Sequence, residues 1–481
     1  MMAQPGTPDN PLRVAIIGSG PSGFYAADHL QRQEQQGGLT VQIDMFDRLP
    51  TPYGLVRGGV APDHPKIKSV TAVYERIARR PNFRFFGNVT FGRDLTLADA
   101  QSLYHAVVLA VGAQTDRTLG IPGEDLPGSH AATEFVAWYN GHPDYRELEF
   151  DLTQEAAVVI GVGNVAMDVT RILSRTYDEL YQTDIADYAL EALRASRVRT
   201  VYVLGRRGPA QAAFTNPEIR ELGELADAGV IVRPDEVALD PLSRAYVDSG
   251  RDKTAIKNVE ILSGYAQQPP RDKPRQIVLR FLVSPVEIVG SERVEAIKIV
   301  RNELYQADSG ELRPRATDAH ETIPVGLVFR SVGYRGVPLP GVPFDERAGI
   351  IPNDKGRVLA AKGGDAVPGL YATGWIKRGP SGIIGTNKPD SVETAEMLLE
   401  DARAGRCWSP GAADSAAVEG LLRARGVRYD TFEDWLALDA LELERGQAIK
   451  RPRLKFSRVD DMLDAVDEAR DNAPALHLSG G

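Results

Sequence analysis

Three glycines and an acid near the start of the chain have the types and spacing of a dinucleotide site. Gly18, Gly20 and Gly23 follow a GxGxxG pattern, and Asp47 ends the next apolar segment. The first glycine permits a tight turn, the second lets the backbone approach a pyrophosphate, and the third lets a helix pack closely. N–H groups at the start of that helix would bind the phosphates. The Asp47 carboxylate can accept hydrogen bonds from ribose hydroxyls and would repel a 2′-phosphate, which favours FAD or NAD over NADP.

A second pattern of this kind ends differently. Gly161, Gly163 and Ala166 match GxGxxA, and the following strand ends in Arg206 and Arg207 with no acid. Two guanidinium groups can pair with a 2′-phosphate, so this site is predicted to bind NADP. Each such hydrogen bond is worth roughly 1.5 to 3 kcal/mol, which corresponds to about a tenfold to hundredfold preference. The alternative is a solvated basic turn without a ligand.

Apolar segments that predict strands and helices flank both patterns. Residues 14–17 and 41–46 predict two strands that enclose a helix, and residues 156–160 begin the second unit. The next strand of that unit, VYVLG, follows a charged and helical insert at residues 174–198. Both segments are therefore predicted to be βαβ units of a parallel sheet.

The segment between the two units predicts a long loop and further strands. Residues 48–68 hold several prolines and glycines, which exclude a regular helix, and loops at this place often carry binding residues. An amphipathic helix is predicted from Lys66 to Pro81, with strands at residues 83–86, 89–91 and 105–111.

The rest of the chain predicts a discontinuous first domain. The strand before Gly112 runs into a turn-rich segment, and residues 327–336 repeat that pattern where the chain returns. Residues 370–387 predict another strand and a glycine-rich turn. We therefore expect a first domain in two parts, 1–115 and 333–481, with a second domain at 116–332 between them. The second part of the first domain ends in a helical extension.

Residues 229–330 and the isolated aromatic residues indicate scaffold. Alternating apolar and polar residues predict antiparallel strands, with no cluster of metal ligands among them. Glu218 and Glu221 lie three residues apart on one helical face, where they could also be solvated carboxylates. Trp408 and Trp435 are interpreted as core residues.

Composition excludes several classes of protein. The 481 residues are 43% hydrophobic and 25% charged, without an apolar run that could span a bilayer. Cys407 is the single cysteine, so the chain cannot hold an iron–sulfur cluster, a cysteine zinc site or an intramolecular redox disulfide. The net charge of −10 argues against nucleic-acid binding. The start, MMAQPGTPDNPLR, lacks a signal sequence, so we expect a cytoplasmic protein. We also expect a protein without a metal, and a monomer.

Four blocks together resemble the adrenodoxin reductase family of ferredoxin–NADP reductases, and most closely its actinobacterial-type members. They are PTPYGLVRGGVAPDHPKIK, GVGNVAMDVTRIL, LGRRGPAQAAFT and GWIKRGPSGIIGTN, and DWLALDALELERGQ resembles the family's C-terminal region. The resemblance implies an α/β fold with two Rossmann-like domains, similar to glutathione reductase without its redox disulfide. It also implies an oxidoreductase that contains FAD, uses NADPH and reduces a small iron–sulfur protein such as ferredoxin.

The same resemblance implies site residues. His64 and Glu221 match positions proposed to assist catalysis. Ser22 and Asp47 stand where many members have alanine and glutamate, and both substitutions are compatible with the same contacts. The implied FAD contacts include Ser22, Asp47, Leu55, Phe91, Trp375, Gly382, Ile383 and Ile384. The implied NADP contacts include Val162, Gly163, Asn164, Val165, Arg206, Arg207, Glu218 and Gly382.

The expected reaction begins with hydride transfer from NADPH to the flavin near Gly382 and continues with single electrons to ferredoxin. A local basic face of Arg206, Arg207, Arg220, Lys377 and Arg378 would attract an acidic ferredoxin despite the acidic total charge.

The alternative functions are an NADPH diaphorase or quinone reductase without a protein acceptor, and a flavin subunit of a larger electron-transfer complex. A flavin monooxygenase is disfavoured because the chain has no FxGxxxH stretch.

Overall fold

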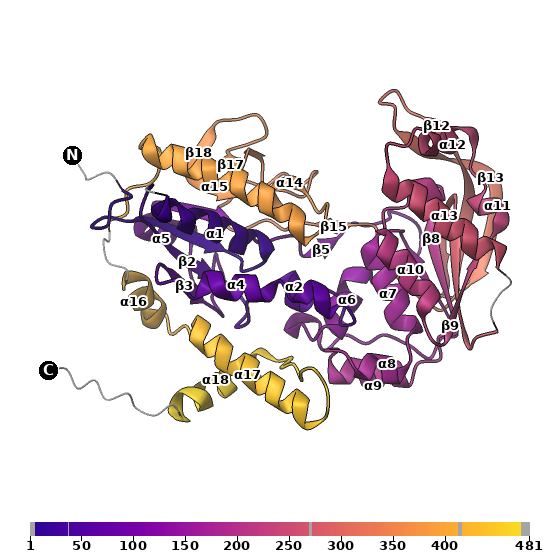
Figure 1. Cartoon of the computed structure of the whole chain (residues 1–481), viewed down its shortest axis with the longest axis horizontal. Helices are drawn as coiled ribbons and strands as arrows, with labels where there is room; N and C mark the ends of the chain where they lie inside the picture. The colour runs from indigo at the N-terminus through magenta and orange to yellow at the C-terminus, as the bar shows by residue number, and fades with distance from the viewer. Residues whose placement is uncertain (1–4, 37, 269–271, 412–415, 473–481) are drawn as a thin grey trace. The chain divides into compact units, whose positions relative to one another are not determined.

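The computed structural model describes residues 5–36, 38–268, 272–411 and 416–472, which form two compact units (Figure 1). Unit 1 contains the described residues within 1–60, 64–115 and 334–481. Unit 2 contains residues 61–63 and the described residues within 116–333. Each unit has its own sheet of wholly or mainly parallel strands, which confirms the predicted α/β fold class.

The sheet of unit 1 has the strand order β16-β17-β18-β4-β1-β2-β3. Five of these strands are parallel, and β16 and β17 form an antiparallel edge. Their apolar sequences agree with burial on both faces of a sheet. The strands are β1 (Leu12–Ile17), β2 (Val41–Phe46), β3 (Phe83–Phe86), β4 (Ala106–Leu109), β16 (Asn353–Asp354), β17 (Arg357–Leu359) and β18 (Ala366–Ala372).

Helices cover both faces of this sheet because its side chains alternate between two cores. Val14 packs with helices on one face, where α1 and α15 lie side by side (Figure 1), while the neighbouring Ala15 belongs to the opposite core. The first face has α1 (Pro21–Gln35), α4 (Thr71–Ala78), α15 (Asn387–Arg403), α17 (Phe432–Ala448) and α18 (Val459–Asn472). The second face has α5 (Leu97–Leu103), α14 (Trp375–Arg378) and α16 (Ala417–Ala424).

Three local predictions in unit 1 are wrong. The loop at residues 48–68 contains a one-turn helix, α2 (Leu55–Gly58). The helix predicted from Lys66 to Pro81 is divided into α3 (Pro65–Lys68) and α4, and at the break the Ser69 hydroxyl donates to the Lys66 carbonyl. Residues 89–91 form no strand, and Phe91 makes only an isolated bridge with Leu95.

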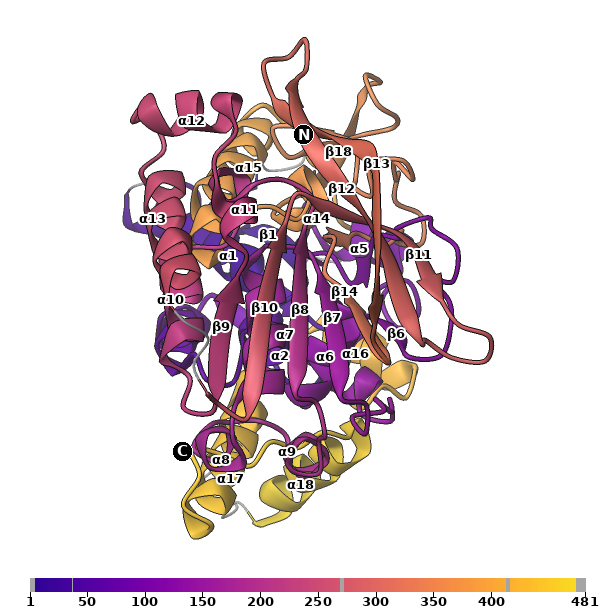
Figure 2. The same cartoon turned by 90° about the vertical axis from the view of Figure 1, so that its right-hand side faces the viewer.

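The sheet of unit 2 is parallel throughout, with the order β6-β14-β7-β8-β10-β9 (Figure 2). Helices cover one face, and a three-stranded antiparallel sheet covers the other. The strands of the parallel sheet are β6 (Ser129–Ala131), β7 (Ala156–Ile160), β8 (Thr200–Gly205), β9 (Ala228–Val232), β10 (Arg275–Phe281) and β14 (Leu327–Arg330).

The covering elements of unit 2 pack against alternate side chains of that sheet. Val159 belongs to the helical core, and the neighbouring Val158 belongs to the core of the antiparallel strands. The helices of this core are α6 (Ala132–Tyr139), α7 (Asn164–Ser174), α8 (Tyr177–Tyr181), α9 (Asp187–Arg194), α10 (Asn216–Glu224), α11 (Pro234–Val237) and α13 (Lys253–Gln267). The antiparallel strands are β11 (Val283–Val289), β12 (Ala296–Gln306) and β13 (Leu312–Pro324). The helix α12 (Pro241–Asp248) instead contacts β12.

The prediction for residues 229–330 was wrong in two respects. Ile277 lies in β10, which is a central parallel strand rather than an antiparallel one. Residues 234–237, 241–248 and 253–267 form the helices α11, α12 and α13, although we predicted strands and loops in this region. Alternation alone does not reveal strand direction, and α13 has apolar residues at helical spacing that the strand pattern around it obscured. Among the helices of the described residues, none has the length and apolar character to cross a membrane.

Candidate cofactor sites

The turn between β1 and α1 holds three glycines in different surroundings. Gly18 has a φ of 104°, and an added Cβ would lie 2.5 Å from the Ala110 carbonyl oxygen. A Cβ on Gly23 would lie 2.3 Å from the Gly18 carbonyl oxygen, so only glycine allows α1 to approach this closely. A Cβ on Gly20 would meet no atom within 4 Å. The turn therefore has open space at the position where the motif places a pyrophosphate.

Asp47 is bound to this turn. Its Oδ2 accepts hydrogen bonds from the Ser19 amide (2.9 Å) and the Ser19 hydroxyl (2.5 Å), and its Oδ1 accepts one from the Leu49 amide (3.0 Å). A carboxylate has about four lone-pair positions, so the protein itself uses most of them. Asp47 thus fixes the glycine turn, and it has less capacity for ribose hydroxyls than the sequence suggests. The sequence analysis missed Ser19, whose hydroxyl inside the glycine motif was the available signal.

The glycine-rich turn after β18 packs against this first turn. A Cβ on Gly374 would lie 2.4 Å from the buried Ser22 hydroxyl, so Ser22 packs within the protein. The Trp375 indole N–H donates to the carbonyl oxygen of Ser381 (3.2 Å). Gly382 has a φ of 80°, and its Cβ would collide with Thr386 at 2.3 Å. A substitution at Gly382 would therefore strain this turn.

The other predicted FAD residues divide into buried and exposed ones. Phe91 is buried in the second core of unit 1, and Ile384 packs at the edge of the first. Leu55 and Ile383 are exposed, at 36% and 59%. Exposed apolar side chains are the ones that can gain from covering a ligand.

The turn between β7 and α7, in unit 2, has the same features as the glycine turn of unit 1. Gly161 has a φ of 131°, and its Cβ would lie 2.2 Å from the Ser331 carbonyl oxygen. A Cβ on Gly163 would meet no atom within 4 Å. Gly163 precedes the first residue of α7, Asn164, so the free N–H groups of this helix start beside that open space.

The loop after β8 holds this second turn. The Val162 carbonyl accepts hydrogen bonds from the amides of Ala213 (2.9 Å) and Phe214 (3.0 Å). The Asn164 side chain accepts one from the Thr215 amide (2.9 Å). Asn164 therefore positions the loop, while Val165 packs against the helical core of unit 2.

The two arginines after β8 differ in their surroundings. Arg206 is exposed, and within the described part of the chain no carboxylate lies within ion-pair distance of it. Arg207 is half-buried, and its Nη1 lies 3.8 Å from a carboxylate oxygen of Glu311. Arg206 is therefore the more available of the two for an anion. The sequence analysis missed Glu311 because it lies in the distant segment between β12 and β13.

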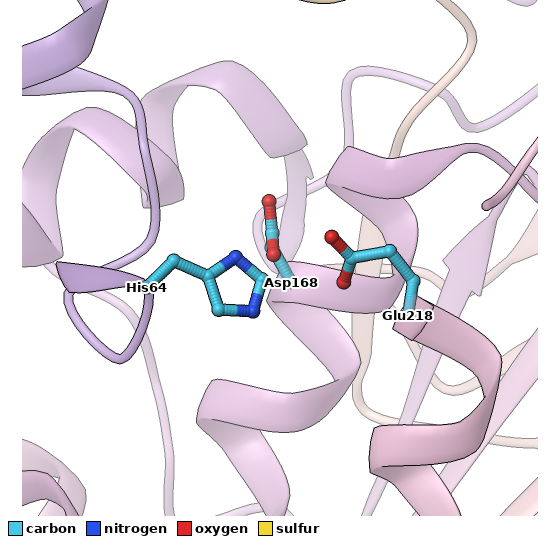
Figure 3. Close-up of side chains that lie close together, drawn as sticks. All are labelled: His64, Asp168 and Glu218. Carbon is cyan, nitrogen blue, oxygen red and sulfur yellow. The ribbon is translucent and has the colours of Figure 1, made fainter. Parts of the chain in front are cut away.

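A buried arginine organises the acids of unit 2. The Arg171 side chain is fully buried in α7, and its guanidinium contacts Asp63 (2.5 Å), Asp168 (2.6 Å), Glu218 (2.8 Å) and Glu221 (3.6 Å). The carboxylate oxygens of Asp168 and Glu218, from α7 and α10, lie within 4.8 Å of each other (Figure 3). Arg171 was missed, although it lies in the TRIL segment of the second motif.

The acid cluster keeps Arg171 charged. Burial alone would lower the pKa of the Arg171 guanidinium, but the carboxylates of Asp168, Asp63 and Glu218 raise it well above its ordinary value. The guanidinium is therefore a permanent cation among the acids. Glu218 is buried and bound to it, so the interpretation of Glu218 as a solvated carboxylate is wrong.

The predicted catalytic residues belong to different units. His64 lies in unit 1 at the start of α3, and Glu221 lies in unit 2 on α10.

Lys377 is not part of a basic surface, because it is buried and paired with Asp390 (3.1 Å) and Glu393 (2.7 Å). Burial raises the pKa of the Cys407 thiol to about 11, so this thiol stays protonated at neutral pH.

The residues present fit two dinucleotides. Both turns combine a strained first glycine with an open second one, and each begins a helix. These features suit a pyrophosphate beside a helix N-terminus. The strand ends differ in charge, with Asp47 in unit 1 and Arg206 in unit 2. One site is therefore suited to a dinucleotide with free ribose hydroxyls, and the other to one with a 2′-phosphate.

Comparisons with known proteins agree with this architecture. The family model described as pyridine nucleotide-disulphide oxidoreductase matches residues 12–234. The chain is 46% identical to NADPH-ferredoxin reductase FprA of Mycobacterium tuberculosis over 94% of this chain and 98% of that protein. It is 41% identical to human mitochondrial NADPH:adrenodoxin oxidoreductase over 95% and 92%. The structure of M. tuberculosis FprA in complex with NADPH matches with a TM-score of 0.90 and 45% identity, over 95% of this chain and all of that one.

Proposed function

Because the chain belongs to the adrenodoxin reductase family of ferredoxin–NADP reductases, we propose that it transfers electrons through FAD between NADPH and a small iron–sulfur protein such as ferredoxin. The family predicted from the four motif blocks is thereby confirmed. The protein is an oxidoreductase, and its cofactors are FAD and NADP.

The contrast between the two strand ends carries this proposal. Asp47 places a negative charge beside the first glycine turn, where it disfavours a 2′-phosphate. Arg206 and Arg207 place positive charge after β8, where they favour one. A chain with one site of each kind can hold FAD in unit 1 and NADPH in unit 2.

The residues of unit 1 would hold FAD. We propose that the Gly18–Gly23 turn binds the pyrophosphate, with Asp47 near the ribose. Ser22, Leu55, Phe91, Trp375, Gly382, Ile383 and Ile384 are the other proposed contacts. When bound, the flavin accepts two electrons as a hydride and releases them one at a time.

The residues of unit 2 would hold NADPH. We propose that residues 162–165 bind its pyrophosphate at the start of α7 and that Arg206 and Arg207 bind its 2′-phosphate. Arg171 holds Glu218 in place, which supports Glu218 as a further contact. Gly382 of unit 1 is also a proposed NADP contact. Glu221 and His64 are proposed to position the nicotinamide or to take up a proton.

A cytoplasmic location and a monomeric state are also proposed. The single thiol offers no intramolecular disulfide, which agrees with a reducing compartment. Both proposed cofactor sites are built from one chain, so catalysis needs no second copy.

The test is reduction of cytochrome c by NADPH, measured with and without added ferredoxin after the bound flavin has been identified. We expect a large ferredoxin-dependent increase that is lost when NADH replaces NADPH. Rapid NADPH oxidation that ignores ferredoxin but responds to quinones would instead indicate a diaphorase. Activity that appears only with further subunits would indicate part of a larger complex.

A further inference from the structure

The helix α17 carries a buried carboxylate that binds the loop after β2. The Glu442 side chain is wholly buried and accepts two hydrogen bonds from the Arg57 guanidinium, at 2.9 and 2.5 Å. Arg453 (2.9 Å) and the Phe456 amide (2.8 Å) also donate to it. Four donors fill the carboxylate, so its charge is fully compensated and its position is fixed.

Trp435 lies about two helical turns before Glu442 on α17 and contacts the same loop. The Arg57 guanidinium lies 5.1 Å from the centre of the Trp435 ring. The ring of Tyr53 meets the Trp435 ring edge-on at 5.7 Å, and the indole N–H of Trp435 points to the Tyr53 hydroxyl at 3.4 Å. Both Trp435 and Tyr53 are buried. The helix thus holds the loop at two points, Tyr53 and Arg57.

The segment held in this way is strained and lies on the first glycine turn. Tyr53 has a φ of 86°, in the region that side chains other than glycine rarely adopt. Its amide donates to the Ser19 carbonyl (3.0 Å), and a Cβ on Gly54 would lie 3.0 Å from the Gly20 Cα. A strained residue persists only where its surroundings determine its conformation. The contacts that fix the conformation of Tyr53 include those with Trp435 of α17.

We propose that Trp435 and Glu442 are positioning residues for FAD, acting through the Tyr53–Arg57 segment on the Ser19–Gly20 turn. Helix α17 then determines how long unit 1 retains its cofactor. This inference rests on the proposed function only in taking FAD as the ligand of that turn. No contact between α17 and FAD is required, because the effect passes through the strained segment.

The test compares two buried carboxylates of unit 1. Glu442→Gln removes the charge that holds Arg57. Asp401→Asn is the matched control, because Asp401 is also buried, accepts from two arginines, Arg357 (2.8 Å) and Arg406 (2.7 Å), and has no described contact with the Tyr53–Arg57 segment. Each purified holoenzyme is diluted, and FAD release is followed by the rise in flavin fluorescence. Hydrogen–deuterium exchange is measured on peptides covering residues 17–24 and 50–60.

We expect Glu442→Gln to release FAD about tenfold faster or more and to speed exchange in both peptides, while Asp401→Asn stays within about twofold of the unchanged protein. Equal release rates for the two variants would overturn the proposal, as would faster exchange at residues 50–60 without faster release. Arg57→Lys is the second variant if Glu442→Gln does not fold. It keeps a cation beside Glu442 but loses the bidentate pair, so an unchanged release rate would also overturn the proposal.

The same experiment separates this inference from the proposed function. If the released cofactor is not FAD, the proposed function fails, whereas the exchange data still test whether α17 holds the glycine turn. If FAD is released normally by both variants while ferredoxin-dependent turnover persists, the proposed function stands and the inference fails.

Discussion

The two glycine turns of this protein share a design and differ in how firmly it is fixed. In each, the second residue of the motif offers its carbonyl to an amide of the loop after the next strand: Ser19 to Tyr53, and Val162 to Ala213. In unit 1 that loop is held by the charged pair of Arg57 and Glu442. In unit 2 it is held by a neutral amide, because the Asn258 side chain donates to the Phe214 carbonyl (3.1 Å).

This difference suits two kinds of ligand. A strained segment with a buried ion pair is costly to rearrange, which favours a cofactor that stays bound. A loop held by neutral hydrogen bonds, with an exposed Arg206 beside it, favours a nucleotide that enters and leaves. The same motif therefore supports either behaviour, and the residues outside the motif decide which one results.

The third position of the motif should show the largest difference. Gly23→Ala places a Cβ 2.3 Å from a backbone oxygen, so we expect unit 1 to lose about 3 kcal/mol or more of stability and most of its FAD. The converse change, Ala166→Gly, should cost about 1 to 2 kcal/mol, since it removes one buried methyl group and increases the backbone entropy lost when the helix forms. Denaturant unfolding and flavin content measure both. Similar losses in the two variants would contradict the comparison.

The strand-end arginines should show the largest effect on nucleotide preference. Arg206→Ala should raise the KM for NADPH about tenfold to hundredfold and leave that for NADH nearly unchanged, because only NADPH has the 2′-phosphate. Arg207→Ala should have a smaller effect, since Arg207 also lies near Glu311. Steady-state kinetics with both nucleotides measures this, with the exposed Arg220→Ala as the control. Equal changes for NADPH and NADH would show that these arginines do not read the 2′-phosphate.

The sequence predicted the local parts of these sites and missed the distant ones. Gly18, Gly20 and Gly23 could be assigned because each acts on its immediate neighbours. Ser19 and Arg171 were missed because their partners, Asp47 and Asp63, become neighbours only in the fold. Their role is not encoded in a spacing along the chain.

Burial was the other property that the sequence did not reveal. Lys377 was predicted to lie on a local basic face, yet it is buried and enclosed by Asp390 and Glu393. The predicted position of β10 was close to correct, but its direction depends on β8 and β9, which lie on either side of it. Pairing partners decide such features, and they are set by tertiary structure.

A buried acid should make the stability of unit 1 depend on pH. Burial and the neighbouring Asp434 raise the pKa of Asp430 from 3.8 to about 7, and its Oδ2 has no hydrogen-bond partner among the described residues. Between these values the folded state binds more protons than the unfolded state, so Asp430 lowers stability as the pH rises from about 4 to 7. Asp430→Asn should therefore stabilise unit 1 by about 3 to 4 kcal/mol at pH 8 and by almost nothing at pH 4. Urea unfolding at both pH values measures this, and a constant difference would refute the assignment.

The smallest predicted effect concerns an acid at the second strand end. Glu311 is half-exposed and lies 3.8 Å from Arg207, where it competes with a phosphate for that guanidinium. An exposed pair is worth about 0.5 kcal/mol, so Glu311→Gln should lower the KM for NADPH about twofold and leave that for NADH unchanged. The gain should disappear at high salt, which screens exposed charges, and in the Arg207→Ala background, where no competition remains. A gain that persists in that background would mean that Glu311 acts on the nucleotide directly. Unit 2 would then have an acid beside its NADPH site, as unit 1 has Asp47 beside its FAD site.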